Sequence, residues 1–409
     1  IKSQEEAIIY LSNEINNSSG AAKNNKQLMK IQDLLHTEVF PHIGLTDNEN
    51  YAKACFLAHM VRKLLWVDSG KIGIDDRDAY PNKRVDLPGF LLASLFRTYF
   101  NNKIVKDIRS SLSKEIHNGS WRASGNFEDI VNPVNINKII KSVILEVGLK
   151  TSLATGNFGS AKIGGPTKIG VSQVLNRLNY VASLSHLRRV STPIEKTGKL
   201  IAPRKLHNTS YGFMCPSETP EGHSVGVVKN MSSTASVSIY SNIKVVKEFI
   251  QKLNIIVPLE KSTITQKHSL TRVFVNGAWI GSLEHKDVMN TIDTLRKAKR
   301  MGKIHMFTGI IWKSHFKELW ITTEAGRLLR PLFVAETLRE IRDNQDLVNE
   351  VNKLETWNDI LLWVSPKGNQ LVEYIDPGET ECSYIAMKPE NINDDHTHCE
   401  LHPATILGT

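Results

Sequence analysis

The sequence lacks the marks of several protein classes. No window approaches the roughly 18 uninterrupted apolar residues that a membrane helix needs, so we predict no membrane span. The opening segment, Ile1 to Glu6, lacks the basic-then-apolar pattern of a signal peptide, which indicates an intracellular chain. The four cysteines (Cys55, Cys215, Cys382 and Cys399) are scattered and form no Cys-x-x-Cys pair, so we expect reduced thiols.

Metal and hydrolase motifs are also missing. His396, His398, Cys399 and His402 are crowded into an acidic segment with no second cluster to complete a zinc site, so we expect no metal there. Asp75-Asp76-Arg77-Asp78 contains its own arginine, which favours a local turn with salt bridges over a divalent-metal site. His223-Ser224 lacks the glycine-flanked serine of a hydrolase. A hydrolase built on residues 396–402 remains an alternative that would require stoichiometric zinc.

The chain is too long for one ordinary core. Single domains usually contain about 100–200 residues, so 409 residues predict several modules. The chain starts at Ile1 and stops in the apolar run Ala404 to Thr409, which would fit a strand cut short. We therefore expect a piece of a longer protein.

Helical patterns dominate the first 150 residues. Ser3 to Glu6 forms a capping box before an apolar run, and apolar spacing predicts helices over 52–67, 87–100 and 135–149. From Ala154 glycines and prolines become frequent: loops are expected around Gly156 to Pro166 and from Thr192 to Lys199, with a possible helix over 171–189 between them. Strand patterns follow: a strand over 235–240, a hairpin over 272–281 with an Asn-Gly turn, and a strand-turn-strand unit over 312–334.

Positive charge is concentrated in one part of the chain. The net charge is +9 and the pI about 9.2, which makes an anionic partner plausible. Between residues 168 and 205, eight cations are opposed only by Glu195: Lys168, Arg177, Arg188, Arg189, Lys196, Lys199, Arg204 and Lys205. A solvated face would explain the same run.

Three motifs in this region suit nucleic-acid binding, and two of them also have a simpler structural explanation. Lys196 and Lys199 beside Gly198 could follow a phosphate backbone, or form a solvated turn. Arg188-Arg189 could contact phosphates, or cap the end of a helix. Residues 203–208 combine a rigid proline with cations and hydrogen-bonding side chains that suit a phosphate or nucleotide.

An acidic turn follows these basic motifs. Two prolines and a glycine fix the backbone around Glu218 and Glu221 within Cys215 to Gly222. Such a turn could position a cation or an arginine, or cap the amides of a neighbouring loop.

The order of these motifs resembles one family. Gly170 to Arg177, Ser185 to Arg189, Thr192-Pro193-Ile194 and Gly198-Lys199-Leu200 are followed by Pro203 to Thr209 and Cys215 to Gly222. This order is similar to the fork region of the second-largest subunit of eukaryote-like multisubunit RNA polymerases. The resemblance extends upstream to residues 75–78, 83–87 and 154–159, and downstream to residues 226–230, 272–277, 325–333 and 398–403.

The resemblance implies an α+β, multidomain fold. Its modules would be the C-terminal part of the lobe (1–88), the second part of the protrusion (89–150) and a loop-rich fork (151–238). Two small α/β external domains (239–325 and 326–388) and the start of the hybrid-binding domain (389–409) would follow. Within the fork, loop 1 would span about 156–170, near the RNA–DNA hybrid, and loop 2 about 191–201, near downstream DNA.

The resemblance also assigns roles to individual residues. Arg204 and Glu221 would lie near the nucleotide-addition site, with Glu221 organising nearby cations, and the chain itself would hold no catalytic residue. Glu195, Lys196 and His223 depart from the family pattern. Nucleic-acid contacts are expected from seven side chains: Gln173, Arg188, Arg189, Lys196, Lys199, Lys205 and His207.

The implied activity is that of a DNA-directed RNA polymerase, a nucleotidyltransferase. Mg²⁺ would be held mainly by the largest subunit, whose Asn-Ala-Asp-Phe-Asp-Gly-Asp motif is absent from this sequence. The implied partners are the largest and smaller polymerase subunits, template and non-template DNA, nascent RNA and nucleoside triphosphates. Location would be nuclear for a cellular protein, or a viral factory or virion for a large DNA virus. A stand-alone nucleic-acid-binding module is the alternative from another class.

Overall fold

The computed structural model describes residues 3–15, 25–119, 122, 125–126, 128, 130, 132–141, 143–159, 168–194 and 196–409. The chain folds into two compact units. Unit 1 contains residues 1–84 and 190–408, and unit 2 contains residues 85–189 together with Thr409. Each unit is described by itself.

The N-terminal part of unit 1 is helical, as the sequence predicts. Helix α1 (Gln4–Ile15) begins after Ser3, whose Oγ accepts a hydrogen bond from the Glu6 amide at 3.2 Å. Helices α2 (Asn25–Thr37) and α3 (Asn50–Asp68) follow. The helix predicted over 52–67 is therefore confirmed as α3. Among the described residues, no helix is both long and apolar enough to cross a membrane.

A five-stranded sheet lies at the centre of unit 1, with strand order β4-β6-β5-β8-β7. The predicted hairpin is confirmed by β5 (Thr271–Val275) and β6 (Ala278–Leu283). Its turn residues Asn276 and Gly277 both have positive φ angles, 47° and 81°, the geometry that makes Asn-Gly favourable in two-residue hairpin turns. The remaining strands are β4 (Val257–Pro258), β7 (Gly309–Lys313) and β8 (Glu318–Thr322).

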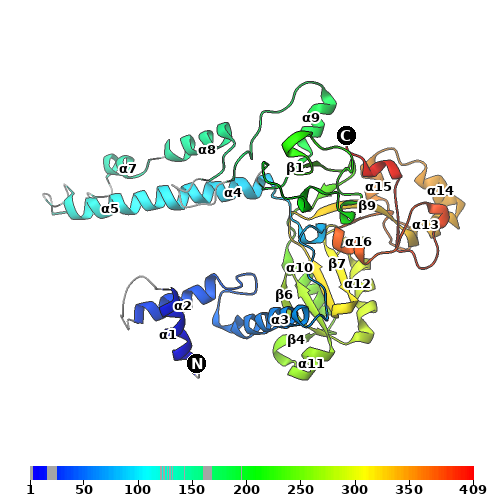
Figure 1. The fold of residues 1–409 in the computed structure, drawn as a ribbon, viewed down its shortest axis with the longest axis horizontal. Coiled ribbons are helices and arrows are strands. Elements are labelled where there is room, and N and C mark those ends of the chain that lie inside the picture. The colour runs from blue at the N-terminus through cyan, green and yellow to red at the C-terminus, as the bar shows by residue number, and fades with distance from the viewer. Residues whose placement is uncertain are drawn as a thin grey trace. The chain divides into compact units, whose positions relative to one another are not determined.

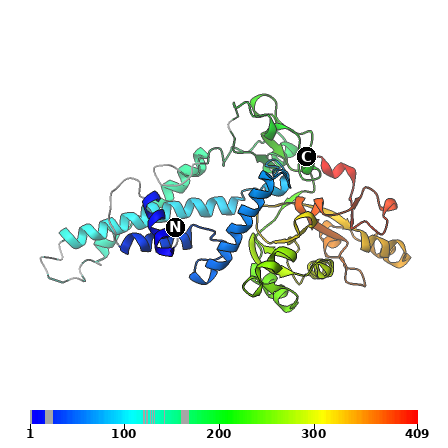
Figure 2. The same cartoon turned by 60° about the horizontal axis from the view of Figure 1, so that its bottom comes forward.

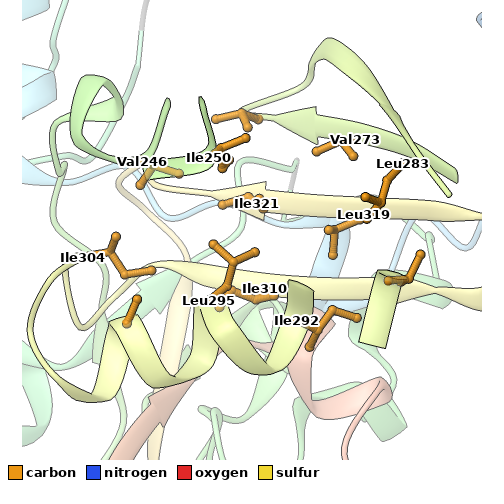
Figure 3. Close-up of a cluster of buried hydrophobic side chains, with 13 residues drawn as sticks. Val246, Ile250, Val273, Leu283, Ile292, Leu295, Ile304, Ile310, Leu319 and Ile321 are labelled. Carbon is orange, nitrogen blue, oxygen red and sulfur yellow. The ribbon is translucent and has the colours of Figure 1, made fainter. Parts of the chain in front are cut away.

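One face of this sheet is covered by α10 (Ile243–Lys252) and α12 (Val288–Arg300). Alternate residues of β5 and β8, such as Val273 and Leu319, point to this face because side chains alternate along a strand. Figure 3 shows Ile292 and Leu295 of α12 directed toward the sheet. The resulting apolar core fixes the sheet against two amphipathic helices.

The opposite face of the sheet packs against α3. Phe274 and Trp320 stack with ring centroids 4.5 Å apart, and Phe56 of α3 lies against the same cluster. Glu318 is fully buried here and pairs with His59 at 3.2 Å and with Lys63 at 3.1 Å. Aromatic packing and buried charge therefore hold α3 on residues more than 200 positions away in the sequence.

A second five-stranded sheet is built around β9 (Leu328–Val334). β9 pairs antiparallel with β10 (Val372–Ile375) and with β12 (His398–Cys399), while β11 (Ile385–Ala386) pairs parallel with β12. β3 (Ser236–Val237) pairs with the start of β9. The strand predicted over 235–240 is thus shorter than expected.

The strand-turn-strand pattern predicted over 312–334 is confirmed by β8 and β9, but these two strands do not pair with each other. β8 and β9 do flank Ala325-Gly326, but they belong to different sheets. Both edges of β8 are already paired in the first sheet, with β5 and with β7. No edge of β8 is left for β9, which pairs in the second sheet instead. Short-range pattern predicts strands but not their partners. The second sheet is accompanied by α13 (Ala335–Arg342), α14 (Gln345–Val351), α15 (Trp357–Leu362) and α16 (Pro377–Glu381).

Buried charges join α12 to this second part of unit 1. Lys299 lies 3.1 Å from Glu373 of β10 and 3.3 Å from Glu379 of α16, and Arg300 lies 3.0 Å from Glu373. Burial raises the pKa of Glu379 to about 7: Lys299 opposes the rise, and the Asp376 and Glu373 carboxylates add to it. Burial also acts to raise the pKa of Glu373, but Lys299 and Arg300 outweigh it and hold that pKa well below the usual range. Removing any one of these side chains would therefore leave a buried charge without its partner and destabilise the fold.

Unit 2 is built on one long helical segment. α4 (Pro88–Tyr99) continues through a π-helical turn (Phe100–Val105) into α5 (Lys106–Asn118). Figure 1 shows the segment as one rod, which Figure 2 shows again from another side. The helix predicted over 87–100 is confirmed and extends further. The single helix predicted over 135–149 is instead two, α7 (Pro133–Ile139) and α8 (Val143–Thr155), which pack on α5 and α4 respectively.

The helix considered for 171–189 is mostly wrong. Only α9 (Tyr180–Leu187) is helical, and residues 171–179 have no regular structure. Asn179 caps α9 by accepting a hydrogen bond from the Ala182 amide at 2.7 Å, and Asn176 accepts one from the Leu178 amide at 3.0 Å. These local side-chain bonds compete with helix formation, and Val174 is 95% exposed, so no packing surface favours the helical form.

The mixture of helical layers and separate sheets confirms the predicted α+β, multidomain class. The predicted module boundaries stay predictions. The remaining helix, α11 (Ile264–Ser269), precedes β5.

Candidate nucleic-acid interface

A two-stranded sheet connects the segment predicted to form loop 2 with the end of the acidic turn. β1 (Arg189–Ser191) pairs with β2 (Val228–Asn230), and the Thr192 amide donates to the Val227 oxygen at 3.0 Å. The Cys215 amide donates to the Asn230 oxygen at 2.8 Å. Loop 2 follows β1 and the acidic turn precedes β2, so both segments are attached to the same two-stranded sheet.

The basic loop, defined here as residues 196–201, carries two of the predicted contact residues. Lys196 and Lys199 are exposed, and neither forms an ion pair with any described residue. Glu195 lies outside the described residues. The loop therefore presents two cations to solvent, as a phosphate-binding loop would.

The Arg204 side chain binds the backbone of the basic loop. Its Nη2 donates to the backbone oxygens of Lys196 at 2.7 Å and Gly198 at 3.1 Å. Its Nη1 donates to the backbone oxygens of His223 at 2.7 Å and Val225 at 2.9 Å. One half-buried guanidinium thus bonds to the basic loop and to the turn after Glu221.

The acidic turn, residues 215–226, approaches the Arg204 backbone closely. Gly226 has a φ angle of +66°, and a Cβ atom there would stand 2.1 Å from the Arg204 oxygen. Thr219 Oγ1 donates to the Val228 oxygen and accepts from the Gly226 amide, each at 3.0 Å. Lys229 Nζ donates to the Pro203 oxygen at 3.2 Å. Glycine is therefore required where the two segments meet.

Sequence reasoning assigned no role to Thr219, Gly226 or Lys229. All three lie in motifs that carry the family resemblance, which was the available signal. Burial lowers the pKa of Lys229, and repulsion from Lys83 adds to this, while Asp78 opposes it. Lys229 acts as a partly buried internal cross-link, a role that depends on contacts between distant residues.

Glu221 is exposed and stands immediately before the short 3-10 turn of Gly222–Ser224. The neighbouring Cys215 is buried, and its Sγ accepts a hydrogen bond from the Glu218 amide at 3.3 Å. The turn is therefore anchored at Cys215 and presents Glu221 to solvent, an arrangement that can place a carboxylate accurately.

His207 is already engaged with protein groups. Its Nε2 lies 2.7 Å from Asp76, and its Nδ1 accepts from the Thr209 amide at 3.2 Å. The hydrogen bond from His207 lowers the pKa of Asp76. The local turn expected at residues 75–78 is present, since the Asp78 amide donates to Asp76 Oδ1 at 2.9 Å, but the salt bridges are made outside it, by Asp76 with His207 and by Asp78 with Lys83 at 3.8 Å. Lys205, in contrast, is exposed.

In unit 2, Gln173 is fixed by α9. The Asn176 amide donates to Nδ1 of His186 at 3.1 Å, so the proton of the neutral ring lies on Nε2, which donates to Gln173 Oε1 at 3.1 Å. The Gln173 amide nitrogen donates to the Gly170 oxygen at 3.1 Å. Gln173 therefore shapes the segment before α9 while remaining exposed.

The two arginines after α9 have different surroundings. Arg188 is the C-cap of α9, as the structural explanation predicted, and burial lowers its pKa. Arg189 is exposed at the start of β1. The eight clustered cations divide equally between the units, with Lys168, Arg177, Arg188 and Arg189 in unit 2.

Loop 1 is described only at its ends. Residues 160–167, which include Gly164, Gly165 and Pro166, lie outside the described residues. At its base Phe158 and Lys168 exchange backbone hydrogen bonds at 2.8 Å, and Lys168 pairs with Asp86. Gly156 has a φ angle of +74°, and its absent Cβ leaves room for the Ser172 oxygen. The base of the loop is thus a closed structure within unit 2.

No group of three or more histidine, cysteine or acidic side chains in the described part of the chain could hold a metal ion. The cluster at 396–402 is divided among separate roles. His398 faces Glu373 at 3.4 Å, Cys399 is buried in β12, and Nδ1 of His402 accepts from the Ala404 amide. These donors do not converge, so they do not fit a zinc centre.

Comparison with known proteins decides the family. The family descriptions "RNA polymerase Rpb2, domain 2", "domain 3" and "domain 4" match residues 1–86, 173–237 and 273–336, in that order. DNA-directed RNA polymerase II subunit RPB2 of Encephalitozoon cuniculi is 39% identical over 395 residues, which are 94% of this chain and 32% of the relative. The chain belongs to the second-largest subunit family of multisubunit RNA polymerases.

Similar subunits come from other kinds of organism. DNA-directed RNA polymerase subunit Rpo2 of Sulfolobus acidocaldarius is 31% identical, over all of this chain and 34% of that protein. DNA-directed RNA polymerase subunit 2 of Acanthamoeba polyphaga mimivirus is also 31% identical, over 99% of this chain and 36% of that protein. The chain spans about a third of the length of these second-largest subunits.

Proposed function

We propose that this chain serves as part of the second-largest subunit of a DNA-directed RNA polymerase and helps to form the cleft in which RNA is made from nucleoside triphosphates. The observation that carries the proposal is the order of the three matched domains along a chain whose relatives are named as polymerase subunits. Polymerase activity belongs to the assembled enzyme, so this chain alone is expected to be inactive.

The basic loop is the part proposed to lie near downstream DNA. Lys196 and Lys199 are exposed on a loop whose backbone is held by Arg204, so their charges can meet phosphates without first breaking an ion pair with a described residue. Lys205 and Arg189 are exposed as well. Such contacts position a nucleic acid without selecting its sequence, which suits an enzyme that must transcribe any template.

The remaining predicted residues have supporting roles in this proposal. Gln173 and Arg188 would face nucleic acid from unit 2, and loop 1 would lie near the RNA–DNA hybrid. His207 would contribute through its pairing with Asp76. Glu221 would organise cations near the nucleotide-addition site, because it is exposed on an anchored turn.

The metal and partners follow from the same proposal. Mg²⁺ would be held mainly by the largest subunit and would assist attack of the RNA 3′ hydroxyl on a nucleoside triphosphate. The proposed partners are the largest and smaller subunits, both DNA strands and nascent RNA. The proposed location is the nucleus, or a viral factory or virion.

A stand-alone nucleic-acid-binding module is not favoured. Alignment with the relatives covers at least 94% of the chain, far beyond the fork motifs, and includes all three matched domains. A module that had borrowed only the fork would match over roughly residues 170–230.

The proposal is tested by the salt dependence of nucleic-acid retention. In the assembled polymerase, replacing Lys196 and Lys199 with alanine should speed dissociation of the elongation complex. The slope of log K against log salt should fall by roughly one for each phosphate that the loop no longer neutralises. Dissociation constants measured between about 50 and 200 mM salt give this slope.

A charge-matched control separates this effect from net charge. Lys244 and Lys247 are exposed on α10, outside the candidate interface, and their replacement with alanine removes the same charge. That control should leave the slope unchanged. An unchanged slope in the loop variant, or an equal fall in both, would contradict the proposed phosphate binding by the loop.

A further inference from the structure

Arg204 has little capacity left for an external ligand. A guanidinium has four terminal N–H groups and one on Nε. All four terminal groups donate to backbone oxygens within unit 1, at distances between 2.7 and 3.1 Å. A two-pronged contact with a phosphate would require at least one of these bonds to break.

The four acceptors belong to two different segments. Two oxygens come from the basic loop, at Lys196 and Gly198, and two from the acidic turn, at His223 and Val225. Each bond is charge-assisted, and the geometry of all four is set by one planar group. Movement of either segment would therefore change the bonds made to the other.

Further contacts make the same connection. Gly226 lies against the Arg204 backbone, where a Cβ would stand 2.1 Å from its oxygen. Lys229 Nζ bridges the oxygens of Pro203 and Gly226. The bond from Arg204 to His223 uses only the backbone oxygen, so the unusual histidine at this position does not affect it.

We infer that Arg204 is a positioning residue that couples the basic loop to the turn bearing Glu221, so that the two segments move together. The inference rests on the proposed function, because coupling matters only if the loop meets nucleic acid and the turn lies near the nucleotide site. Arg204 would thus act through Lys196, Lys199 and Glu221 and not by touching the nucleotide.

Hydrogen exchange tests the coupling directly. In the assembled polymerase without nucleic acid, Arg204→Lys and Arg204→Ala should both speed amide exchange in residues 196–201 and 223–226, by about tenfold or more. Lysine keeps the charge but cannot reproduce four hydrogen bonds in a planar arrangement, so Arg204→Lys should not restore the slow exchange of the wild type. Unchanged exchange in either segment would overturn the inference.

Thr219→Val is the matched comparison. It removes the hydroxyl that bonds to Val228 and Gly226 while keeping the side-chain shape. This change should speed exchange in residues 223–226 only, since Arg204 still holds the loop. Equal acceleration of residues 196–201 by Thr219→Val would indicate general loosening and would count against a specific role of Arg204.

Transcription measurements separate positioning from direct contact. Arg204→Lys should speed dissociation of the elongation complex about tenfold in the wild-type background, but less than about twofold when Lys196 and Lys199 are already alanine. A direct nucleotide contact predicts instead that lysine preserves the KM for nucleoside triphosphates and alanine raises it in both backgrounds. That pattern would overturn the inference. Faster exchange of both segments without faster dissociation would support the coupling and contradict the proposed DNA contact of the loop.

Discussion

At the scale of single residues, Glu318 is a fully buried carboxylate whose pKa is set by its partners. It is fully buried between α3 and the first sheet, where it meets His59, Lys63 and the indole N–H of Trp320. Burial alone would raise its pKa, but the hydrogen bond from His59 and the charge of Lys63 outweigh burial and lower the pKa to about 2. The carboxylate is therefore stabilised only as long as its partners are in place.

Glu318→Gln should destabilise the chain by about 3 kcal/mol near pH 7, because it leaves the buried Arg272 guanidinium, 3.5 Å from Glu318, and the nearby Lys63 without their counter-charge. The folded-state pKa lies below the usual value of 4.5, so the contribution of Glu318 is present above pH 4.5 and lost as pH falls toward 2. The difference between wild type and variant should shrink over that range. Urea unfolding followed by tryptophan fluorescence measures this difference.

Glu324→Gln provides a matched control, since Glu324 pairs with Arg84 while 43% exposed. An exposed pair contributes less than about 1 kcal/mol, so this variant should stay close to wild type at every pH. A pH-independent loss in Glu318→Gln would contradict the electrostatic explanation and favour altered packing.

At the scale of elements, the acidic turn approaches the Arg204 backbone too closely to admit a side chain at Gly226. Gly226→Ala places a methyl group 2.1 Å from a backbone oxygen at a φ angle of +66°, so both strain and a clash result. We expect a loss of about 2 kcal/mol or more in the free energy of unfolding, measured by urea denaturation of the chain.

Gly222→Ala separates the two causes. Gly222 lies in the same turn with a φ angle of +75°, but a Cβ there would meet nothing within 4 Å. It should cost only the strain of the left-handed backbone, about 1 kcal/mol. Equal losses for the two variants would show that the close approach at Gly226 carries no additional cost.

At the scale of the whole molecule, burial is distributed unequally. In unit 1 the first sheet has apolar cores on both faces. Among the described residues of unit 2, the buried apolar side chains are Leu95, Ile130 and Phe158, while Val174, Leu178 and Tyr180 are each more than 80% exposed. Stability from apolar burial should therefore come mainly from unit 1.

This difference predicts the pattern of hydrogen exchange in the isolated chain. Amides of β5 and β8 should exchange at least about 1,000-fold more slowly than those of residues 171–179, because opening the sheet exposes its cores. Exchange followed by mass spectrometry measures both segments in one sample. Similar rates in the two would contradict the unequal burial.

The sequence predicted those features that depend on neighbouring residues. The helix α3, the Asn-Gly hairpin and the end of α9 at Arg188 all follow from spacing, turn chemistry or capping. The helix considered over 171–189 failed because Asn176 and Asn179 bond locally and Val174 packs against nothing. The strands β8 and β9 were predicted but their partners were not, because residues distant in the sequence decide which sheet a strand joins.

The features of the candidate site also fall into two groups, those that the sequence predicted and those that the tertiary structure decided. Motif order in the sequence was sufficient to identify the family and the candidate side chains, because residue types and their spacing survive in a linear pattern. Only the tertiary structure decided that Arg204 directs its four terminal N–H groups to two separate segments, and that His207 pairs with Asp76. Those bonds join residues from different segments, and a backbone oxygen that accepts a hydrogen bond leaves no trace in the sequence.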